Sequence, residues 1–415
     1  MRLFFMLLAA ALTFLLSCQK PIDNPNPTVP PGPTPPPVIT PASPADTAKT
    51  IFFDTREDDV TGNSFTTLTA FAPNGAMKWK RTQLGTSSKP YMTVNNSVIY
   101  FSASYFQFLN GGPSFVSYNN LYAINVESGS NLWANTNSND YVYSMVARND
   151  TLFCSMTSGS SNFIGAYKAT TGTLLWKSQI SYPYAATNLT LDGNRLYFAT
   201  ASSTTVNNIV AFDIASRTIK WDTPIGINIS GVFSNMAIEG SNIFLRNGVG
   251  NLLALNKATG SNIWSKVDRS YDQPVVGNSI AYTTTENGLA AFSTADGTPK
   301  WQWDISSSWF KGGLPFLSDK KIYISGVGNA GFVARLDAAT GSVEWKKDMS
   351  DVLQYPLVAA DKLVLFRSAT LNSGQASIMI YDAKTGIAKS TIPLSGSEFN
   401  RPSIITGSGK WIHTY

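Results

Sequence analysis

Short runs of apolar residues, rather than long helical periods, dominate the chain after residue 50. Residues 98–101 (VIYF) and 363–366 (LVLF) are examples, rich in β-branched and aromatic side chains and bounded by polar or glycine-containing turns. Apolar runs this short, with turn residues on both sides, are typical of buried β-strands. The pattern therefore predicts an all-β protein made of many short antiparallel strands.

One hairpin pattern recurs eight times from residue 66 onward. An apolar strand ends at a polar residue, a Thr-Gly pair turns the chain, and a second strand carries a tryptophan four residues after the glycine, as in residues 166–176 (AYKATTGTLLW). Glycine suits this turn because it adopts a positive φ at little steric cost. The intact glycine and tryptophan pairs are Gly75/Trp79, Gly129/Trp133, Gly172/Trp176, Gly260/Trp264, Gly297/Trp301 and Gly341/Trp345. Two copies are degenerate, with Arg217 replacing glycine before Trp221 and Ser390 replacing tryptophan after Gly386.

Each hairpin is preceded by two further strand-like runs, so one repeat contains four strands. A four-stranded unit of roughly 44 residues has the size of one β-propeller blade. Eight copies predict an eight-bladed β-propeller of four-stranded antiparallel blades, with a seven-bladed ring as the alternative.

The first copy has only one strand-like run before it, at residues 51–53, so the first blade lacks its innermost strand. The C-terminal residues 401–406 fit this place, and residues 411–413 compete for it. Pairing of the N- and C-terminal strands would close the ring and remove free sheet edges. The sequence leaves open which C-terminal strand enters the first blade.

Residues 336–345 (LDAATGSVEW) carry the clearest family signature. They resemble the PQQ-like repeat of quinoprotein alcohol dehydrogenase-like propellers, and the resemblance covers about residues 51–415. In that family the repeat tryptophan packs against the adjoining blade. The resemblance therefore implies a blade-packing role for Trp79, Trp133, Trp176, Trp221, Trp264, Trp301 and Trp345.

The first 48 residues are expected to direct export and membrane attachment and to lie outside the folded domain. Arg2 followed by an apolar run through residues 3–16 is typical of a secretory signal peptide, here residues 1–17. The ending Leu16-Ser17-Cys18 resembles the lipobox of bacterial lipoproteins. This implies cleavage before Cys18, lipidation of its thiol and anchoring in a membrane. Because Gln19 is not aspartate, the resemblance favours the outer membrane, and the side that the protein faces stays open.

Residues 18–48 are predicted to form a tether. Residues 21–44 contain half of the 22 prolines, which can form neither helix nor sheet. An extended polyproline segment of this length would reach roughly 70 Å from the membrane, at ~3.1 Å per residue. The propeller domain is then expected to span residues 49–415.

Composition excludes several kinds of chemistry. The net charge is +5 and no run of lysine and arginine exceeds two residues, so we expect no nucleic-acid binding. His413 is the only histidine, which argues against a multi-histidine metal site and against a Ser-His-Asp triad. Once Cys18 carries lipid, Cys154 has no disulfide partner, and its apolar neighbours predict a buried, unreactive side chain.

Two resemblances bear on function. Quinone-dependent dehydrogenases of the repeat family use an adjacent cysteine pair, a calcium site and an aspartate base, and this chain has no such pair. We therefore expect no PQQ, no other cofactor, no metal and no enzyme activity. A lipobox followed by this propeller also resembles the lipoprotein subunit of the outer-membrane protein assembly machinery, which implies a non-catalytic scaffold with a protein partner. Carbohydrate or small-ligand binding in the funnel is the alternative, and PQQ-dependent dehydrogenation a more distant one.

A binding rim is predicted where the connections between blades meet the central channel. The long loop at residues 102–120 is rich in aromatic residues, and every repeat has an aromatic residue 7 to 12 positions after its tryptophan or Ser390. Such rings either form a recognition surface or close the channel mouth as core. The candidate rim residues are Phe106, Phe108, Tyr143, Tyr184, Tyr271, Trp309, Phe310 and Tyr355.

Overall fold

The computed structural model describes residues 48–413 except 59–63, 83, 87–90, 109–114, 202–205, 228–235, 248, 268–272, 286–287, 306–310, 313, 328–330, 350–352, 360–361, 368–376, 395–397, 400–402 and 407–410. Cys18 and the proline-rich segment lie outside these residues. Residues Ile39–Tyr415 form one compact unit, and every regular element described within it is a β-strand.

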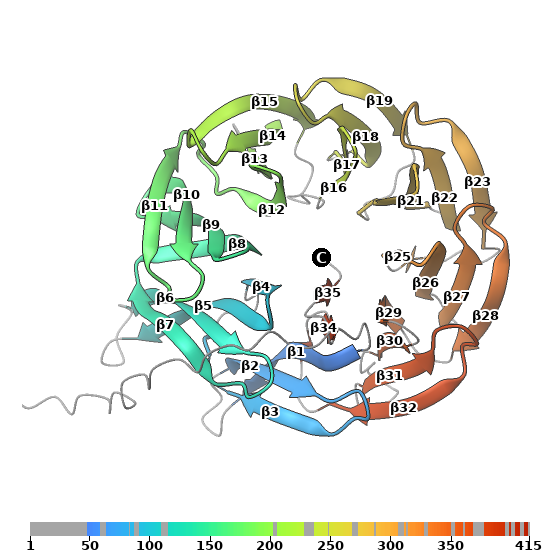
Figure 1. The fold of residues 1–415 in the computed structure, drawn as a ribbon, viewed down its shortest axis with the longest axis horizontal. Coiled ribbons are helices and arrows are strands. Elements are labelled where there is room, and N and C mark those ends of the chain that lie inside the picture. Colours follow the sequence, from blue (N-terminus) through green and yellow to red (C-terminus); the bar gives the residue numbers. More distant parts are fainter. Residues whose placement is uncertain are drawn as a thin grey trace, which may run out of the picture. The chain divides into compact units, whose positions relative to one another are not determined.

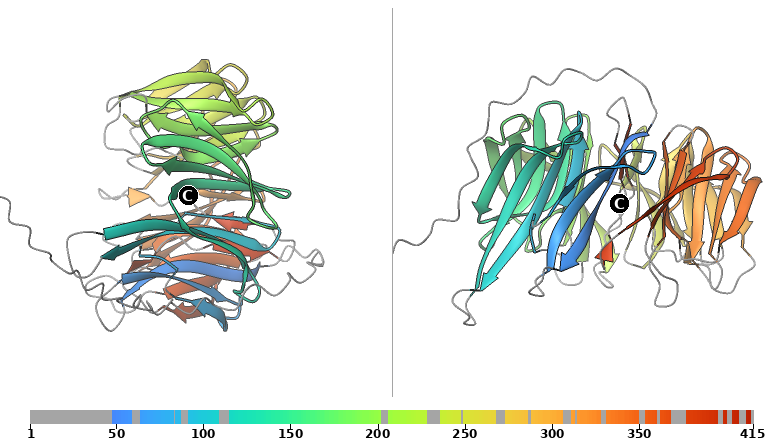
Figure 2. Two further views of the ribbon diagram at one scale, coloured as in Figure 1. Left: turned by 90° about the vertical axis from the view of Figure 1, so that its left-hand side faces the viewer. Right: turned by 90° about the horizontal axis from the view of Figure 1, so that it is seen from below.

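The strands form eight sheets arranged as blades around a central channel (Figure 1), and Figure 2 shows the ring from two sides. The predicted eight-bladed, all-β propeller is confirmed, and the seven-bladed alternative is wrong. In blades 2 to 8 the strands follow the chain from the channel outward. The ring is therefore built by one antiparallel motif repeated along the sequence, as the turn spacing predicts.

The strand bounds follow the blades. Blades 2 and 3 contain β4 (Tyr91–Asn95), β5 (Val98–Phe108), β6 (Phe115–Asn125), β7 (Asn131–Ser138), β8 (Asp140–Arg148), β9 (Thr151–Ser158), β10 (Ser161–Lys168) and β11 (Leu174–Ile180). Blades 4 and 5 contain β12 (Thr187–Asp192), β13 (Arg195–Ala201), β14 (Val206–Asp213), β15 (Thr218–Ile227), β16 (Ala237–Glu239), β17 (Asn242–Arg246), β18 (Asn251–Asn256) and β19 (Asn262–Val267). Blade 6 contains β20 (Val275–Gly277), β21 (Ile280–Thr285), β22 (Gly288–Ser293) and β23 (Pro299–Asp304). Blades 7 and 8 contain β24 (Lys311–Gly312), β25 (Phe316–Ser318), β26 (Lys321–Val327), β27 (Gly331–Asp337), β28 (Val343–Met349), β29 (Leu353–Ala359), β30 (Lys362–Arg367), β31 (Ser377–Asp382) and β32 (Ala388–Pro393).

Blade 1 joins the two ends of the described chain. It contains β1 (Ala48–Asp58), β2 (Ser64–Phe71), β3 (Met77–Arg81), β33 (Glu398–Phe399), β34 (Ser403–Thr406) and β35 (Trp411–His413). β34 takes the place beside β1, with Ile404 paired to Ile51. β35 does not compete for that place, because it pairs with the other edge of β34 as an additional strand. Both candidate C-terminal strands therefore enter the same blade.

The alternating strand directions give the ring two different faces. The tight turns between the first and second strands and between the third and fourth strands of each blade lie on one face, which we call the turn face. The loops between the second and third strands and the connections between blades lie on the opposite face, which we call the loop face. The innermost strands of blades 2 to 8 consequently begin at the loop face and run along the channel.

The apolar core is divided into eight clusters, each lying between two neighbouring blades. One cluster joins Phe52 and Leu68 of blade 1 to Ile99 and Phe101 of blade 2, all fully buried. The last cluster joins blade 8 to Ile51 and Phe53 of blade 1. A blade buries both faces only when two neighbours are present, so the closed ring is the stable unit.

The repeat tryptophan of one blade lies on the repeat glycine of the next. The ring of Trp79 in blade 1 covers Gly129 in blade 2, where a Cβ would lie 2.6 Å from Cδ2 of the ring. Gly129 has a φ of 70°, so glycine is required there for its conformation as well as for its size. The Trp79 indole N–H also donates a hydrogen bond to the Val126 carbonyl at 2.7 Å. The same ring-on-glycine contact pairs Trp133 with Gly172, Trp221 with Gly260, Trp264 with Gly297, Trp301 with Gly341 and Trp345 with Gly386.

Each of the two degenerate copies replaces one partner of this contact, the glycine in blade 4 and the tryptophan in blade 8. Arg217 occupies the glycine position of blade 4 with a φ of 56°, and its guanidinium lies over the ring of Trp176, 5.3 Å from the centroid. Trp176 is half-buried and, within the described residues, its indole makes no hydrogen bond. At the closure of the ring, Ile392 rather than a tryptophan lies beside Gly75. An aliphatic side chain thus fills the space that the missing ring leaves.

Candidate functional site

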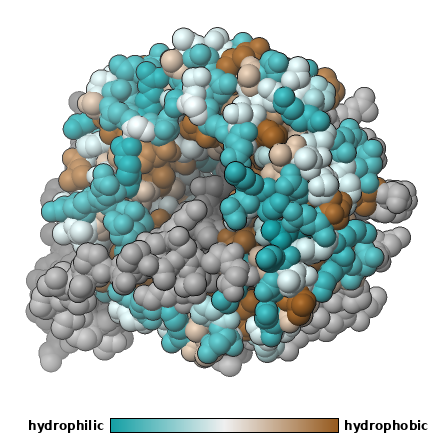
Figure 3. Space-filling model, turned by 45° about the vertical axis from the view of Figure 1, so that its right-hand side comes forward, coloured by the Kyte–Doolittle hydropathy of each residue, from teal (hydrophilic) through white to brown (hydrophobic). Residues whose placement is uncertain are grey.

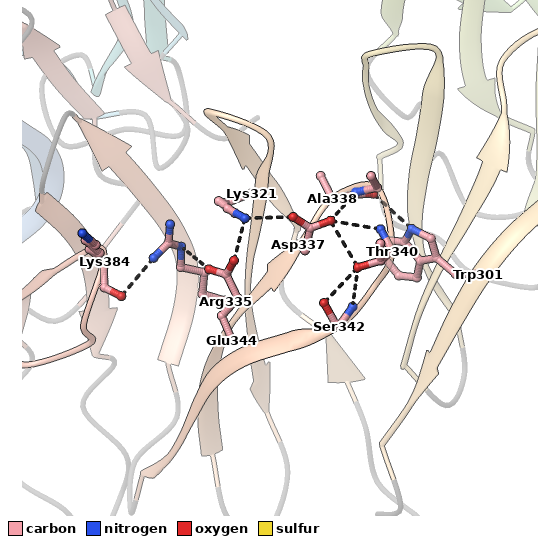
Figure 4. A network of polar contacts seen from close by, with 10 residues as sticks. Trp301, Lys321, Arg335, Asp337, Ala338, Thr340, Ser342, Glu344 and Lys384 are labelled. Atoms are coloured by element: carbon pink, nitrogen blue, oxygen red, sulfur yellow. Dashed lines mark hydrogen bonds and ion pairs between the residues drawn. The ribbon is translucent and has the colours of Figure 1, made fainter.

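The polar residues of the repeat signature stabilise the turn face, as Figure 4 shows for blade 7. Asp337 Oδ1 accepts hydrogen bonds from the backbone N–H groups of Ala339 and Thr340, and its Oδ2 contacts Lys321 Nζ at 2.8 Å. The hydrogen bond from Lys321 is the main reason why the pKa of Asp337 is lowered to about 2. The Asp337 carboxylate therefore shapes the turn and stays ionised beside Lys321.

The same network connects blade 7 to its neighbours. Arg335 Nε contacts Glu344 at 3.1 Å, and its guanidinium donates a hydrogen bond to the Lys384 carbonyl of blade 8 at 2.9 Å. On the other side, the Trp301 indole of blade 6 donates to the Ala338 carbonyl at 3.0 Å (Figure 4). The signature residues therefore hold blades together, and the candidate functional site lies elsewhere.

Within the described residues, two pockets are formed by the innermost strands and the segments that lead into them. The first, which we call the apolar pocket, has a volume of about 290 Å³ and is lined by residues 237–238, 273–276 and 314–317 of blades 5 to 7. Its lining consists of aliphatic residues, two prolines and Phe316, with Gln273 as the one side chain that carries polar atoms. Figure 3 shows apolar side chains at the wall of the central hollow and polar ones around it.

The second pocket, which we call the tyrosine pocket, has a volume of about 120 Å³ and is lined by residues 91–92, 143–145 and 188–190 of blades 2 to 4. The rings of Tyr91 and Tyr143 come from neighbouring blades and lie 6.1 Å apart at an angle of 56°. Partial burial, and secondarily Tyr143, raises the pKa of Tyr91, so its phenol is neutral at physiological pH. The lining contains no charged side chain, so it suits an uncharged ligand.

The predicted rim residues are spread over described and undescribed parts of the chain. Tyr143 lies in the tyrosine pocket, and Tyr184 lies in the connection to β12 with 42% of its surface exposed. Phe106 and Phe108 belong to β5 and Tyr355 belongs to β29, but the side chains of these three residues are not among those described. Three further candidates lie wholly outside the described residues: Tyr271, Trp309 and Phe310.

Sequence reasoning missed most of the pocket lining. Met92, Met145 and Asn188 of the tyrosine pocket were not candidates, nor was Phe316 of the apolar pocket. Their shared signal is the position within the repeat, because each lies near the beginning or middle of an innermost strand. That signal becomes informative only when the strands are known to surround one channel.

The described residues offer little other reactive chemistry. Cys154 is fully buried between blades 2 and 3, and burial raises the pKa of its thiol. Among these residues, no three histidine, cysteine, aspartate or glutamate side chains gather into a group that could hold a metal ion. The part of the chain that the structure describes has no helix long and apolar enough to cross a membrane.

Comparison with known proteins identifies relatives of most of the propeller. A family model described as outer membrane protein assembly factor BamB matches residues 64–303 and 286–389. A search of curated protein sequences found no match.

Several solved structures share the fold. BamB from Moraxella catarrhalis is 14% identical, with a TM-score of 0.53, over 78% of this chain and 96% of that chain. The dihydro-heme d1 dehydrogenase NirN is 9% identical, with a TM-score of 0.60, over 89% and 77%. A quinohemoprotein alcohol dehydrogenase from Pseudomonas putida is 12% identical, with a TM-score of 0.50, over 78% and 69%. At these identities the likeness concerns the fold alone.

Proposed function

The chain belongs to the family described as outer membrane protein assembly factor BamB, and from this premise we propose that it is a non-catalytic scaffold of the cell envelope that binds a protein partner. The observation that carries the proposal is the family match, which extends over nearly all the blades. The repeat signature supports it, because its conspicuous residues hold turns and blade contacts rather than a reacting group.

The partner binds at the loop face in this proposal. That face carries the exposed ring of Tyr184 in the connection between blades 3 and 4, whereas signature side chains of the turn face such as Lys321 and Asp337 are engaged with one another. Apolar and aromatic anchors of this kind supply most of the binding energy in protein interfaces. The rim candidates Phe106, Phe108, Trp309 and Phe310 stay predictions, because their side chains lie outside the described residues.

Lipidation of Cys18 supplies the membrane attachment, and the proline-rich tether lets the propeller reach a partner away from the lipid surface. The outer membrane is the favoured location, in line with the name of the family. Dehydrogenase activity is the weaker alternative, because Cys18 and Cys154 cannot form the adjacent cysteine pair that such enzymes would use.

Site-specific photo-crosslinking in the cells that produce the protein tests this proposal. A photoreactive amino acid is placed at Tyr184 on the loop face or at Ile387 on the turn face, two side chains of which 42% and 57% are exposed. We expect one stoichiometric protein adduct from position 184 and none from position 387, identified by mass spectrometry. Equal labelling at both positions, or no protein adduct from position 184, would refute a loop-face scaffold.

A further inference from the structure

Two of the three innermost strands that line the tyrosine pocket, β8 and β12, carry β-bulges. In β8, Val142 pairs with Met156 and Ser144 with Ser155, so Tyr143 is the additional residue between two paired neighbours. In β12 the register also shifts between Thr187 and Thr190, which leaves Asn188 and Leu189 opposite a single residue of β13. Bulges interrupt a ladder and redirect a side chain, and they are frequent next to binding sites.

The two bulges are held to each other across the blade boundary. The backbone N–H of Leu189 in blade 4, at the bulge of β12, donates a hydrogen bond to Ser144 Oγ in blade 3 at 2.9 Å. Asn188 has a φ of 54°, a left-handed conformation that non-glycine residues adopt at a cost. The hydrogen bond between the two bulges holds this part of the pocket wall in one conformation before a ligand binds. Such preorganisation lowers the entropic cost of binding.

The lining suits one aromatic ring. A cavity of about 120 Å³ is somewhat smaller than the ~150 Å³ of an engineered apolar cavity that binds benzene. The tilted rings of Tyr91 and Tyr143 can form edge-to-face contacts with a third ring. The thioethers of Met92 and Met145 add favourable contacts between sulfur and an aromatic ring, and their flexible side chains adapt to its position.

We propose that the tyrosine pocket receives one aromatic side chain from an extended, uncharged segment of the partner protein. This inference rests on the proposed function and names the part of the partner that the loop face recognises. The channel already holds one extended segment whose sequence contains an aromatic residue. This segment is β35 (WIH), which pairs with the inner edge of β34. A saccharide fits less well, because it needs several free polar groups around its hydroxyls, whereas the Ser144 hydroxyl is engaged by Leu189.

Peptide binding to the purified full-length protein in detergent provides the test. The probes are the peptide Ser-Thr-Ser-Phe-Ser-Thr-Ser-amide, labelled with fluorescein at its N-terminal amine, and the same labelled peptide with alanine in place of phenylalanine, compared by fluorescence anisotropy. We expect the phenylalanine peptide to bind about tenfold more tightly or better. The double variant Tyr91→Ala/Tyr143→Ala should abolish this difference, and Tyr91→Phe/Tyr143→Phe should retain it. Leu175→Ala, at a position 51% exposed on the outer strand β11, is the matched control and should bind like the parent.

The position of the bound ring is read from methionine methyl groups by NMR. Saturation with the phenylalanine peptide should shift the methyl signals of Met92 and Met145, assigned through Met92→Leu and Met145→Leu. The methyl signal of Met77, 60% exposed on the outer strand β3, should stay in place. The shifts distinguish binding in the pocket from nonspecific adsorption even if an alanine variant fails to fold.

Three outcomes overturn the inference. Equal affinity for the two peptides shows that no aromatic side chain is recognised. Unmoved Met92 and Met145 signals place the peptide elsewhere. Binding of neutral monosaccharides that is lost in Tyr91→Phe/Tyr143→Phe assigns the pocket to carbohydrate, through the phenol hydroxyls. If the Tyr184 crosslink to a protein persists in any of these cases, the scaffold function stands and only the identity of the pocket's occupant is wrong.

Discussion

The contact between Trp264 of blade 5 and Gly297 of blade 6 allows the blade-packing mechanism to be tested quantitatively. Trp264 is 8% exposed, and its indole donates a hydrogen bond to the Thr294 carbonyl at 3.2 Å. A Cβ on Gly297 would lie 2.8 Å from Cδ2 of the ring and 2.9 Å from Cε of Lys266. The two perturbations are Trp264→Ala, which removes the ring, and Gly297→Ala, which pushes against it.

Removal of the ring should cost about 4 kcal/mol of unfolding free energy. A buried tryptophan covers ~200 Å², which at ~25 cal/mol per Å² corresponds to roughly 5 kcal/mol before allowing for residual burial in the unfolded chain. The lost hydrogen bond adds about 1 kcal/mol. Residual burial in the unfolded chain reduces the first figure by roughly a third, so the total is about 4 kcal/mol, within the ~3–5 kcal/mol typical of such truncations in protein cores.

Gly297→Ala should cost about 3 kcal/mol for two reasons. Its φ of 70° is unfavourable for alanine by roughly 1–2 kcal/mol, and the clash with the ring adds ~1–3 kcal/mol. In the double variant the clash with the ring is gone while the unfavourable φ remains. The costs of the two single variants should therefore sum to about 1–3 kcal/mol more than the cost of the double variant, which is the free energy of the clash.

Urea denaturation followed by tryptophan fluorescence and circular dichroism measures these free energies. Trp176→Ala is the matched control, because that ring is half-buried, makes no hydrogen bond within the described residues and faces Arg217 instead of glycine. It should cost about 2 kcal/mol, less than Trp264→Ala. Additive costs at Trp264 and Gly297 would show that the ring does not press on the glycine. Equal losses at Trp176 and Trp264 would show that burial does not set the cost.

Three further predictions concern single groups. Cys18→Ala should abolish incorporation of a lipid label and release the protein from membrane fractions; a variant that still sediments with membranes would exclude this anchor. The pKa of Asp337 is lowered from its ordinary value to about 2, so its stabilisation is present above about pH 4 and is lost as the pH falls toward 2. Melting temperatures between pH 4 and 2 should accordingly fall less in Asp337→Asn than in the parent, and parallel curves would contradict the role of Lys321. Cys154 should resist a thiol reagent in the native protein and react after unfolding, because its side chain is fully buried and burial raises the thiol pKa; rapid native labelling would contradict this burial.

The sequence by itself determined the blade number and the β-strand order. The glycine turn and the tryptophan that follows it are local features, since a positive φ and a large apolar ring impose the same hairpin wherever they recur. Cys154 could be placed inside for a similar reason, because its neighbours in the apolar run at residues 151–154 belong to a buried strand. Local patterns of this kind are readable because each depends on residues a few positions apart.

The tertiary structure alone decided the closure and the pockets. Residues 403–406 and 411–413 have equally strand-like sequences, and only pairing with β1, more than 300 residues earlier, assigns β34 to the place beside β1 and β35 to the inner edge of the sheet. The tyrosine pocket combines side chains of three blades with two bulges, and a bulge changes which side chains face the channel without changing the apolar pattern. Contacts between residues about 45 positions apart are set by how neighbouring blades pack, and no local period records them.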